Sequence, residues 1–203
     1  MKHPIVVAIT GASGVIYGKR LLEVLIDKNF EIHLSISESG QKVLEHELGL
    51  NIDLHDFDLS RLVPNADDAQ LHYHFYKDFM TPIASGSSQT SAMVICPCSG
   101  STLSGIAAAQ GGNLIQRAAE VHLKEKRPLI LVPRETPLSL MQIRNLEAVA
   151  TAGATVMPAS PGFYHGYETV DHLVDFIVAR ILDHLGIEHD LIRRWGSGDE
   201  SEK

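Results

Sequence analysis

The sequence predicts a doubly wound, mostly parallel α/β sheet with helices on both faces, in three αβα layers. Short apolar runs alternate along the chain with longer segments that have helical spacing. Gly or Pro stands near the ends of several of the longer segments, where these residues commonly stop a helix. Strands and helices in alternation form right-handed crossover units, and such units place their strands parallel in one sheet.

Five strands are predicted from the apolar runs. Runs of four or five residues suit buried strands, because helices need longer periodic segments. Four runs of this kind and a weaker fifth one cover residues 5–9, 32–36, 92–96, 129–132 and 155–157.

Five helices are predicted between and after these strands, from apolar residues that recur at helical spacing. They cover residues 16–28, 39–48, 113–125, 139–152 and 170–185. A further helix is expected to begin at residues 99–102. Residues 51–68 are acidic and polar without a clear period, which indicates a surface excursion rather than a domain boundary.

The length of 203 residues suits one domain with a substantial core. We expect residues 1–195 to form that domain and residues 196–203 to be a flexible C-terminal tail.

Composition excludes several classes of protein. Seventeen Lys and Arg against 25 Asp and Glu give a net charge of −8, which argues against a sequence-independent grip on nucleic acid or on an anionic membrane. No apolar run approaches the roughly 20 residues of a membrane span, so we expect a cytoplasmic protein. Cys96 and Cys98 are too close for an ordinary disulfide and lack zinc-site spacing, so we expect packed thiols.

Small polar residues follow the first strand, where ligands bind in open α/β sheets. Thr10-Gly11-Ala12-Ser13-Gly14 leads into a helix, whose N-terminal N–H groups and the Ser13 hydroxyl can meet a phosphate. A tight turn with no ligand is the alternative interpretation. Glu38, after the second strand, is a poorly placed ribose ligand and is more simply a first-turn helix carboxylate.

Three later strand ends carry similar signals. Ser99, Ser101 and Thr102 set three hydroxyls around Gly100, of which helix capping explains one. Arg134 and Glu135 stand side by side between two prolines, in a rigid loop whose alternative role is an exposed ion pair. Residues 158–165 form a stiff aromatic loop that can wall a pocket.

Two histidines are the strongest candidates for a metal site. His72 and His74 fall two apart on a possible strand and therefore on one face. Because no third ligand stands at a convincing spacing, we expect no metal.

A set of short blocks, in order over nearly the whole chain, resembles the UbiX-type flavin prenyltransferase family. These blocks are residues 10–14, 85–87, 93–99, 117–119, 123–125, 132–137, 161–165, 178–180 and 194–195. The resemblance implies a Rossmann-like, flavodoxin-like subunit that binds FMN, needs no metal, and assembles into a homo-oligomer, a dodecamer, with active sites between subunits.

The resemblance also implies roles for individual residues. Its FMN-binding positions are Gly11, Ala12, Ser13, Ser37, Ser99, Gly100, Ser101, Thr102 and Arg134. Its dimethylallyl phosphate positions are Lys124, Tyr164 and Arg180, with Arg117 nearby and with Trp195, which is also a candidate interface residue. Its catalytic positions are Ser13, near flavin N5, and the carboxylates Glu47 and Glu135.

The implied reaction joins a dimethylallyl group to N5 and C6 of reduced FMN. Its product, prenylated FMN, would serve a separate UbiD-type decarboxylase, as in ubiquinone biosynthesis. Lys124, Arg134 and Arg180 suit a departing phosphate, and Glu47 or Glu135 would suit acid–base work if burial raises their pKa values.

Two alternatives stay open. One is an FMN-dependent decarboxylase of an aromatic acid, such as 3-polyprenyl-4-hydroxybenzoate. The relatives that decarboxylate a peptidyl cysteine carry Pro-Ala-Met-Asn where this chain has Pro133-Arg134-Glu135-Thr136, which disfavours that branch. The other is a non-enzymatic flavin carrier, in which the basic residues and Glu135 would share no purpose.

Overall fold

The computed structural model describes residues 3–64, 66–67, 69–163 and 167–193. The chain divides into two compact units, Met1–Ala159 and Ser160–Lys203. The first unit holds the whole sheet, and the second holds the long helix α7 (Val170–Leu185). The structure describes each unit by itself, so one domain over residues 1–195 stays a prediction, and the expected tail lies outside the described residues.

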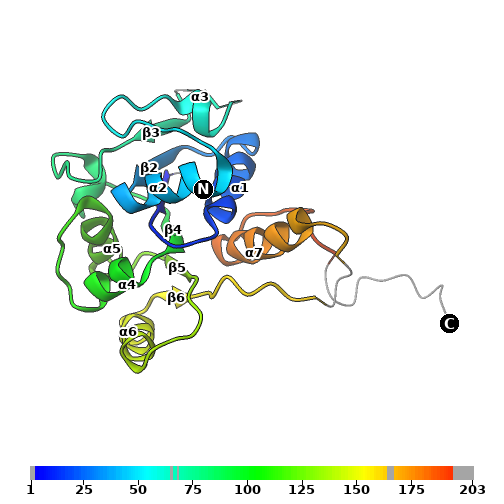
Figure 1. Cartoon of the computed structure of the whole chain (residues 1–203). Coiled ribbons are helices and arrows are strands. Elements are labelled where there is room, and N and C mark those ends of the chain that lie inside the picture. Colours follow the sequence, from blue (N-terminus) through cyan, green and yellow to red (C-terminus); the bar gives the residue numbers. More distant parts are fainter. Residues whose placement is uncertain (1–2, 65, 68, 164–166, 194–203) are drawn as a thin grey trace. The chain divides into compact units, whose positions relative to one another are not determined.

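The first unit is built on a six-stranded parallel sheet in the order β3-β2-β1-β4-β5-β6 (Figure 1). The strands are β1 (Ile5–Ile9), β2 (Ile32–Ile36), β3 (Leu71–Tyr73), β4 (Ala92–Cys98), β5 (Leu129–Pro133) and β6 (Thr155–Val156). The predicted α/β class and the five predicted strands are confirmed. The edge strand β3 was not among those five, because three residues, of which only Leu71 is buried, give hardly any periodic signal.

In its described residues the first unit also contains six α-helices and a short 3₁₀ helix, η1 (Pro82–Ala84). The α-helices are α1 (Val15–Asp27), α2 (Glu38–Leu48), α3 (Leu59–Leu62), α4 (Gly100–Ala107), α5 (Leu114–Lys124) and α6 (Leu140–Thr151). The predicted helices agree within one or two residues, and α3 lies in the predicted surface excursion. Side-chain caps explain several starts, since Ser37, Ser99, Asn113 and Ser139 each accept a backbone N–H of the helix that follows.

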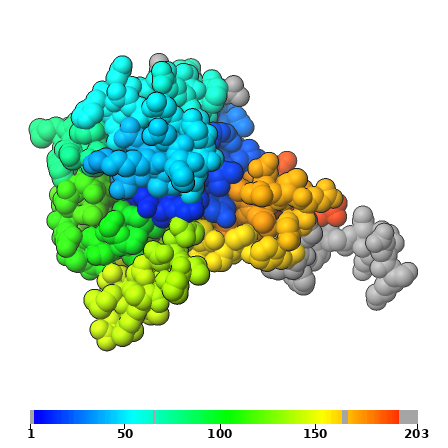
Figure 2. All heavy atoms as spheres, in the orientation of Figure 1, coloured from blue at the N-terminus to red at the C-terminus, as the bar shows by residue number. Residues whose placement is uncertain are grey.

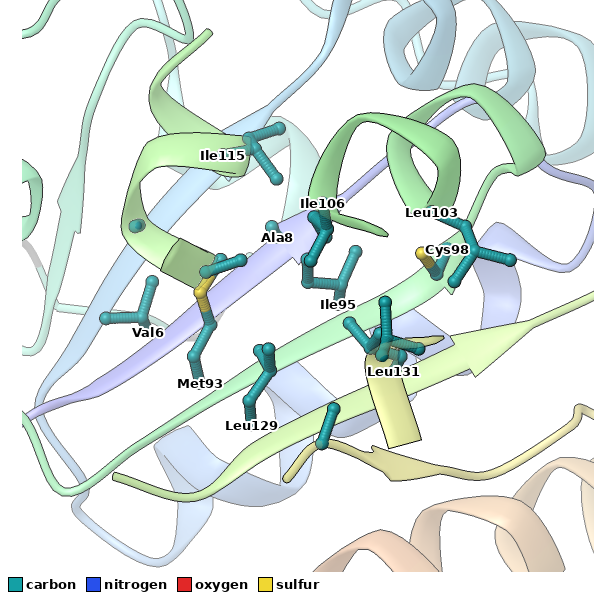
Figure 3. Packing of buried hydrophobic residues seen from close by; sticks show 14 of the residues in the cluster. Val6, Ala8, Met93, Ile95, Cys98, Leu103, Ile106, Ile115, Leu129 and Leu131 are labelled. Carbon is teal, nitrogen blue, oxygen red and sulfur yellow. The ribbon is translucent and has the colours of Figure 1, made fainter. Parts of the chain in front are cut away.

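The two faces of the sheet are covered by different helices. Val6, Ala8, Met93, Ile95, Leu129 and Leu131 alternate along three strands and pack with α4 and α5 in one apolar core (Figure 3). On the other face α1 packs so closely that a Cβ on Gly18 would lie 2.2 Å from the backbone oxygen of Cys96. This close packing fixes the strand ends that carry the polar residues.

None of the helices in the described ranges is long and apolar enough to span a membrane. The second unit contains a cavity of about 400 Å³ beside α7, lined by residues that include Tyr167, His172, Phe176 and Arg193.

Candidate functional site

Thr10 joins the carboxyl ends of β1 and β4. Its buried hydroxyl donates to the carbonyl oxygen of Pro97 at 2.8 Å and accepts the backbone N–H of Ser99, also at 2.8 Å. A hydroxyl can do both at one atom. The turn after β1 and the start of α4 are therefore held together, which places the two strongest hydroxyl-rich segments of the sequence side by side.

Two glycine-mediated contacts bring the start of α2 to the same edge. A Cβ on Gly11 would lie 2.3 Å from the Cβ of Ser39, and a Cβ on Gly40 would lie 2.6 Å from the carbonyl oxygen of Ile9. Only glycine fits at such distances. Ser37, between β2 and α2, consequently lies close to the turn that contains Gly11 and Ala12.

Some of the hydroxyls at this edge cap helices, and others are exposed. Ser37 Oγ accepts the N–H of Gly40 at 3.0 Å, and Ser99 Oγ accepts the N–H of Thr102 at 3.3 Å. Ser101 is exposed, with its Oγ 3.2 Å from Ser99 Oγ, and Ser13 is exposed in the turn after β1. Capping thus accounts for Ser37 and Ser99, whereas Ser13 and Ser101 face outward.

Glu47 binds the N-terminus of α1. Its Oε2 accepts the backbone N–H of Gly14 at 2.9 Å and that of Val15 at 3.2 Å. The sequence suggested that these N–H groups would meet a phosphate, but in this chain a carboxylate occupies that position. The contact brings Glu47, from the end of α2, next to Ser13, so two of the three predicted catalytic residues are neighbours.

Arg134 and Glu135 reach the same region from the end of β5. Arg134 Nε donates to the carbonyl oxygen of Ser13 at 3.3 Å. Glu135 accepts the N–H of Thr136 at Oε1, at 3.3 Å, and Nε2 of Gln142 at Oε2, at 3.2 Å. The arginine and the carboxylate do not pair with each other, which corrects the ion-pair alternative. Ser13, Glu47 and Arg134 therefore gather around the start of α1, whereas Glu135, the next residue after Arg134, contacts α6.

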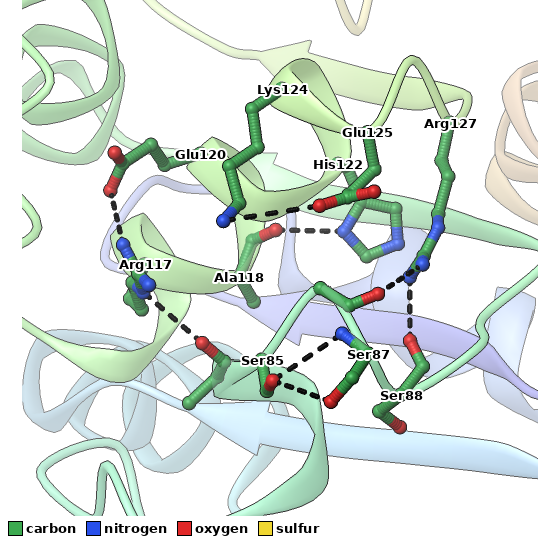
Figure 4. Close-up of polar contacts among 12 residues, drawn as sticks. Ser85, Ser87, Ser88, Arg117, Ala118, Glu120, His122, Lys124, Glu125 and Arg127 are labelled. Carbon is green, nitrogen blue, oxygen red and sulfur yellow. Dashed lines mark hydrogen bonds and ion pairs between the residues drawn. The ribbon is translucent and has the colours of Figure 1, made fainter.

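A second polar cluster lies around residues 84–90 (Figure 4). Arg117 Nε donates to the carbonyl oxygen of Ala84 at 3.1 Å, and Lys124 Nζ lies 3.9 Å from Glu125. Arg127 donates to the carbonyl oxygens of Gly86 and Ser88, each at 2.6 Å. The Oγ atoms of Ser85 and Ser87 are 2.9 Å apart.

A buried histidine, His122, lies next to this second polar cluster. His122 contacts the Thr90 hydroxyl through Nε2 at 2.9 Å and the Ala118 carbonyl oxygen through Nδ1 at 2.7 Å (Figure 4). Burial lowers the pKa of His122. The neutral ring can donate at one nitrogen and accept at the other, so it ties α5 to the segment before β4.

The two polar clusters lie at opposite ends of β5. Lys124 is the last residue of α5, before β5 begins, whereas Arg134 follows the end of the strand. Five strand residues span about 17 Å at roughly 3.3 Å each. One subunit therefore does not bring its own Lys124 and Arg134 together. A site that uses both residues cannot be built from a single subunit.

The remaining predicted substrate residues belong to the second unit. Arg180, on α7, donates from Nη1 to Asp183 Oδ2 at 2.8 Å. Tyr164 and Trp195 lie outside the described residues.

Cys96 and Cys98 are buried free thiols, as predicted. Burial raises the pKa of Cys98 to about 12 and raises that of Cys96 further. Thiols this hard to ionise are unsuited to nucleophilic work.

Glu38 is a first-turn carboxylate, as predicted. Its hydrogen bond with Lys42, four residues along α2, lowers the pKa of Glu38. The other oxygen of Glu38 accepts the hydroxyl of Tyr76 at 3.3 Å, so both carboxylate oxygens have a partner.

His33, on β2, stacks on His74, which directly follows β3. His33 Nδ1 lies 2.6 Å from His74 Nε2, and His72 Nε2 lies 3.4 Å from Glu31. Burial lowers the pKa of His74 to about 4 and lowers that of His33 as well. Within the part of the chain that the structure describes, no three His, Cys, Asp or Glu side chains are arranged to hold a metal.

Comparison with known proteins identifies the family. A protein-family model described as Flavoprotein matches residues 1–182. Flavin prenyltransferase UbiX of Halalkalibacterium halodurans is 47% identical over 94% of this chain and 92% of its own, and that of Pseudomonas aeruginosa is 46% identical over 95% and 93%. The chain belongs to the flavin prenyltransferase UbiX family. The resemblance seen in the sequence is thereby confirmed.

Solved structures of UbiX proteins have the same fold. The crystal structure of AnUbiX (PadA1) in complex with FMN and dimethylallyl pyrophosphate has a TM-score of 0.86 and 35% identity, covering 98% of this chain and all of that one. A dodecameric FMN-dependent UbiX-like decarboxylase from Escherichia coli O157:H7 has a TM-score of 0.84 and 38% identity, covering 96% and 100%. The peptidyl-cysteine decarboxylase EpiD, at 16% identity and a TM-score of 0.57, shares the fold alone.

Proposed function

We propose that this UbiX-family protein is a flavin prenyltransferase that joins a dimethylallyl group from dimethylallyl phosphate to reduced FMN. The observation that carries the proposal is that Glu47 and Arg134 both bind the turn that contains Ser13, with Glu135 next to Arg134 in the chain, at the carboxyl edge of a flavoprotein sheet. A flavin carrier needs no such combination of two carboxylates, a hydroxyl and an arginine.

The residues at this edge fit FMN. Gly11 and Gly40 let backbone segments approach closely, and Gly100 leaves room at the start of α4. Ser13 and Ser101 expose hydroxyls, and Arg134 supplies a fixed positive charge in a chain with a net charge of −8. Together with Ala12, Ser37, Ser99 and Thr102, these residues would hold the phosphate and the polar edge of the ring.

The bound reduced flavin would supply the nucleophile, and the protein would manage charge and protons. Arg134, with Arg117, Lys124 and Arg180, would stabilise the negative charge on the departing phosphate. Glu47 and Glu135 would take up and return protons, and Ser13 would orient the reacting edge of the ring. Tyr164 and Trp195 would help to enclose the allyl group.

The proposed site needs more than one subunit. Because β5 separates Lys124 from Arg134, the lysine that acts beside Arg134 would come from a neighbouring copy. The α6 region offers a contact surface for such a copy: Leu138, Leu140, Met141 and Ile143 are exposed there by 44–63%. Figure 2 shows the yellow-green segment that includes α6 standing out from the green surface of the first unit. We propose a homododecamer with shared sites.

Several finer points belong to the same proposal. The donor would be the monophosphate, the allyl group would be joined at N5 and C6, and the product would pass to a UbiD-type decarboxylase in the cytoplasm. No metal would take part.

The proposal is tested by anaerobic incubation of the purified protein with reduced FMN and either dimethylallyl phosphate or the diphosphate. Mass spectrometry of the bound flavin should show the added prenyl group, with faster formation from the monophosphate. Arg180→Ala should slow the reaction roughly ten- to hundredfold while FMN stays bound, since it removes a charge-assisted contact. Release of carbon dioxide from an aromatic acid, with an unmodified flavin, would instead support the decarboxylase alternative.

A further inference from the structure

Gln142 joins three parts of the candidate site. Its Oε1 accepts the backbone N–H of Ser139 at 2.9 Å, and its Nε2 donates to Glu135 Oε2 at 3.2 Å. A Cβ on Gly100 would lie 3.2 Å from the same Nε2. The amide therefore lies between the start of α6, the carboxylate after β5 and the start of α4.

The orientation of this amide is fixed by chemistry. The Ser139 N–H can only donate, so the amide oxygen must face it. The NH₂ group must then face Glu135. Gln142 is also the N3 residue of the α6 capping box, in which its backbone N–H bonds to Ser139 Oγ at 3.2 Å. That bond caps the helix, whereas the side-chain amide is oriented by the Ser139 backbone N–H.

We propose that Gln142 is a positioning residue that holds the Glu135 carboxylate in its working orientation. This inference rests on the proposed function, because it assigns a purpose to a contact of a predicted catalytic group. Among the residues that the structure describes, the second oxygen of Glu135 accepts only the N–H of the adjacent Thr136, at 3.3 Å. That contact is local to the loop, so Gln142 supplies the contact that ties the carboxylate to a helix.

No charged side chain on the packed elements can replace Gln142 in this role. Helix α4 carries no charged residue, and Arg134, in the same loop, is directed to the backbone of Ser13. The charged residues of α6 are Arg144 and Glu147, which lie further along that helix. The orientation of Glu135 therefore depends on a neutral amide.

Two matched variants separate positioning from helix capping. Gln142→Glu keeps a side-chain acceptor for the Ser139 N–H, and thus the capping box, but replaces the N–H donor with a second carboxylate. Ser139→Ala removes the hydroxyl that caps α6 but keeps the backbone N–H that orients Gln142. We expect Gln142→Glu to lower kcat for prenyl transfer roughly ten- to hundredfold with an unchanged melting temperature. Ser139→Ala should lower the melting temperature and leave kcat near wild type.

The KM for dimethylallyl phosphate and the FMN affinity should be unchanged in Gln142→Glu, because the contact serves a proton-handling group rather than a ligand. If Gln142→Glu does not fold, Gln142→Met offers a neutral side chain of similar length, whose kcat should fall more than that of Ser139→Ala at equal loss of stability. Wild-type kcat in Gln142→Glu, or losses that follow stability alone, would overturn the proposal. A wild-type protein that does not prenylate FMN at all would instead contradict the proposed function.

Discussion

The carboxylate of Glu47 binds the backbone N–H of Gly14 at 2.9 Å and thereby closes the N-terminus of α1 with a side chain from the end of α2. A carboxylate at this position gains from the positive end of the helix dipole. It also keeps a negative charge within the group that contains Ser13 and Arg134. Glu47 thus has a structural contact and a proposed chemical role at the same atoms.

Variants of Glu47 should separate these two roles. Glu47→Gln keeps an oxygen that can accept the Gly14 N–H, so the free energy of unfolding should change by less than about 1 kcal/mol. Glu47→Ala removes the cap and should cost about 0.5–2 kcal/mol. Prenyl transfer should fall roughly a hundredfold or more in both, because both lose the group that exchanges protons. Urea denaturation and anaerobic product assays measure the two effects, and a fully active Glu47→Gln would show that the charge is dispensable.

Mixed oligomers should regain activity lost in two separate variants. Lys124→Ala and Arg134→Ala should each be inactive, since each lacks one contact with the phosphate. If the two residues come from different subunits, unfolding and refolding the variants together should restore up to about a quarter of the sites, because each residue is intact in half of the subunits. Each variant refolded alone is the control. No recovery in the mixture, with oligomers of normal size, would mean that one subunit supplies both residues.

Gly11→Ala should push the turn after β1 away from α2. The added methyl would lie 2.3 Å from Ser39 Cβ, closer than atoms can approach. We expect a loss of about 1–3 kcal/mol in the free energy of unfolding and weaker FMN binding. Ser39→Gly in the same chain removes the clashing atom and should restore part of both. Equal FMN affinity in Gly11→Ala and wild type would show that this turn does not hold the flavin.

The stacked histidines should make stability depend on pH below neutrality. The folded-state pKa of His74 is lowered from 6.5 to about 4, so the unfolded chain binds protons more readily between these values. The stabilising neutral form is complete above pH 6.5, and its contribution is lost as the pH falls toward 4. Allowing for the screening of a half-exposed ring, the loss should be roughly 1 kcal/mol.

His74→Gln should reduce this slope when urea unfolding is followed from pH 7.5 to 4.5. His46→Gln, an exposed position on α2, is the matched control and should leave the slope unchanged. A slope that is the same in all three proteins would place the titrating groups elsewhere.

The sequence predicted the strands and the polar residues at their carboxyl ends because both leave local signals. Runs such as Ile5–Ile9 are short and apolar, and the hydroxyls of Ser99 and Ser101 follow a strand directly. Ser139 and Gln142 have the spacing of a capping box, so their pairing could have been inferred, although the contact with Glu135 could not.

Other features depend on contacts that no local pattern reveals. Glu47 and Gly14 are 33 residues apart, and nothing near either residue indicates their pairing. Lys124 and Arg134 are near in sequence, but they lie at opposite ends of β5 and are therefore far apart in space. The buried bridge made by Thr10 was likewise missed, because a threonine in a turn gives no sign that its hydroxyl is enclosed.

The two hydrogen bonds of the Thr10 hydroxyl limit which residues can replace Thr10. The Thr10 hydroxyl donates to one backbone atom and accepts from another in a space closed to water. Valine has the same shape and would fill the space, but it would leave the backbone N–H of Ser99 without the hydroxyl that accepts it. The Pro97 carbonyl oxygen would keep only the backbone N–H of residue 10, at 3.2 Å. Among neutral residues of this size only serine and threonine keep both contacts. Substitution between these two residues at position 10 is therefore tolerated during evolution, whereas valine is selected against.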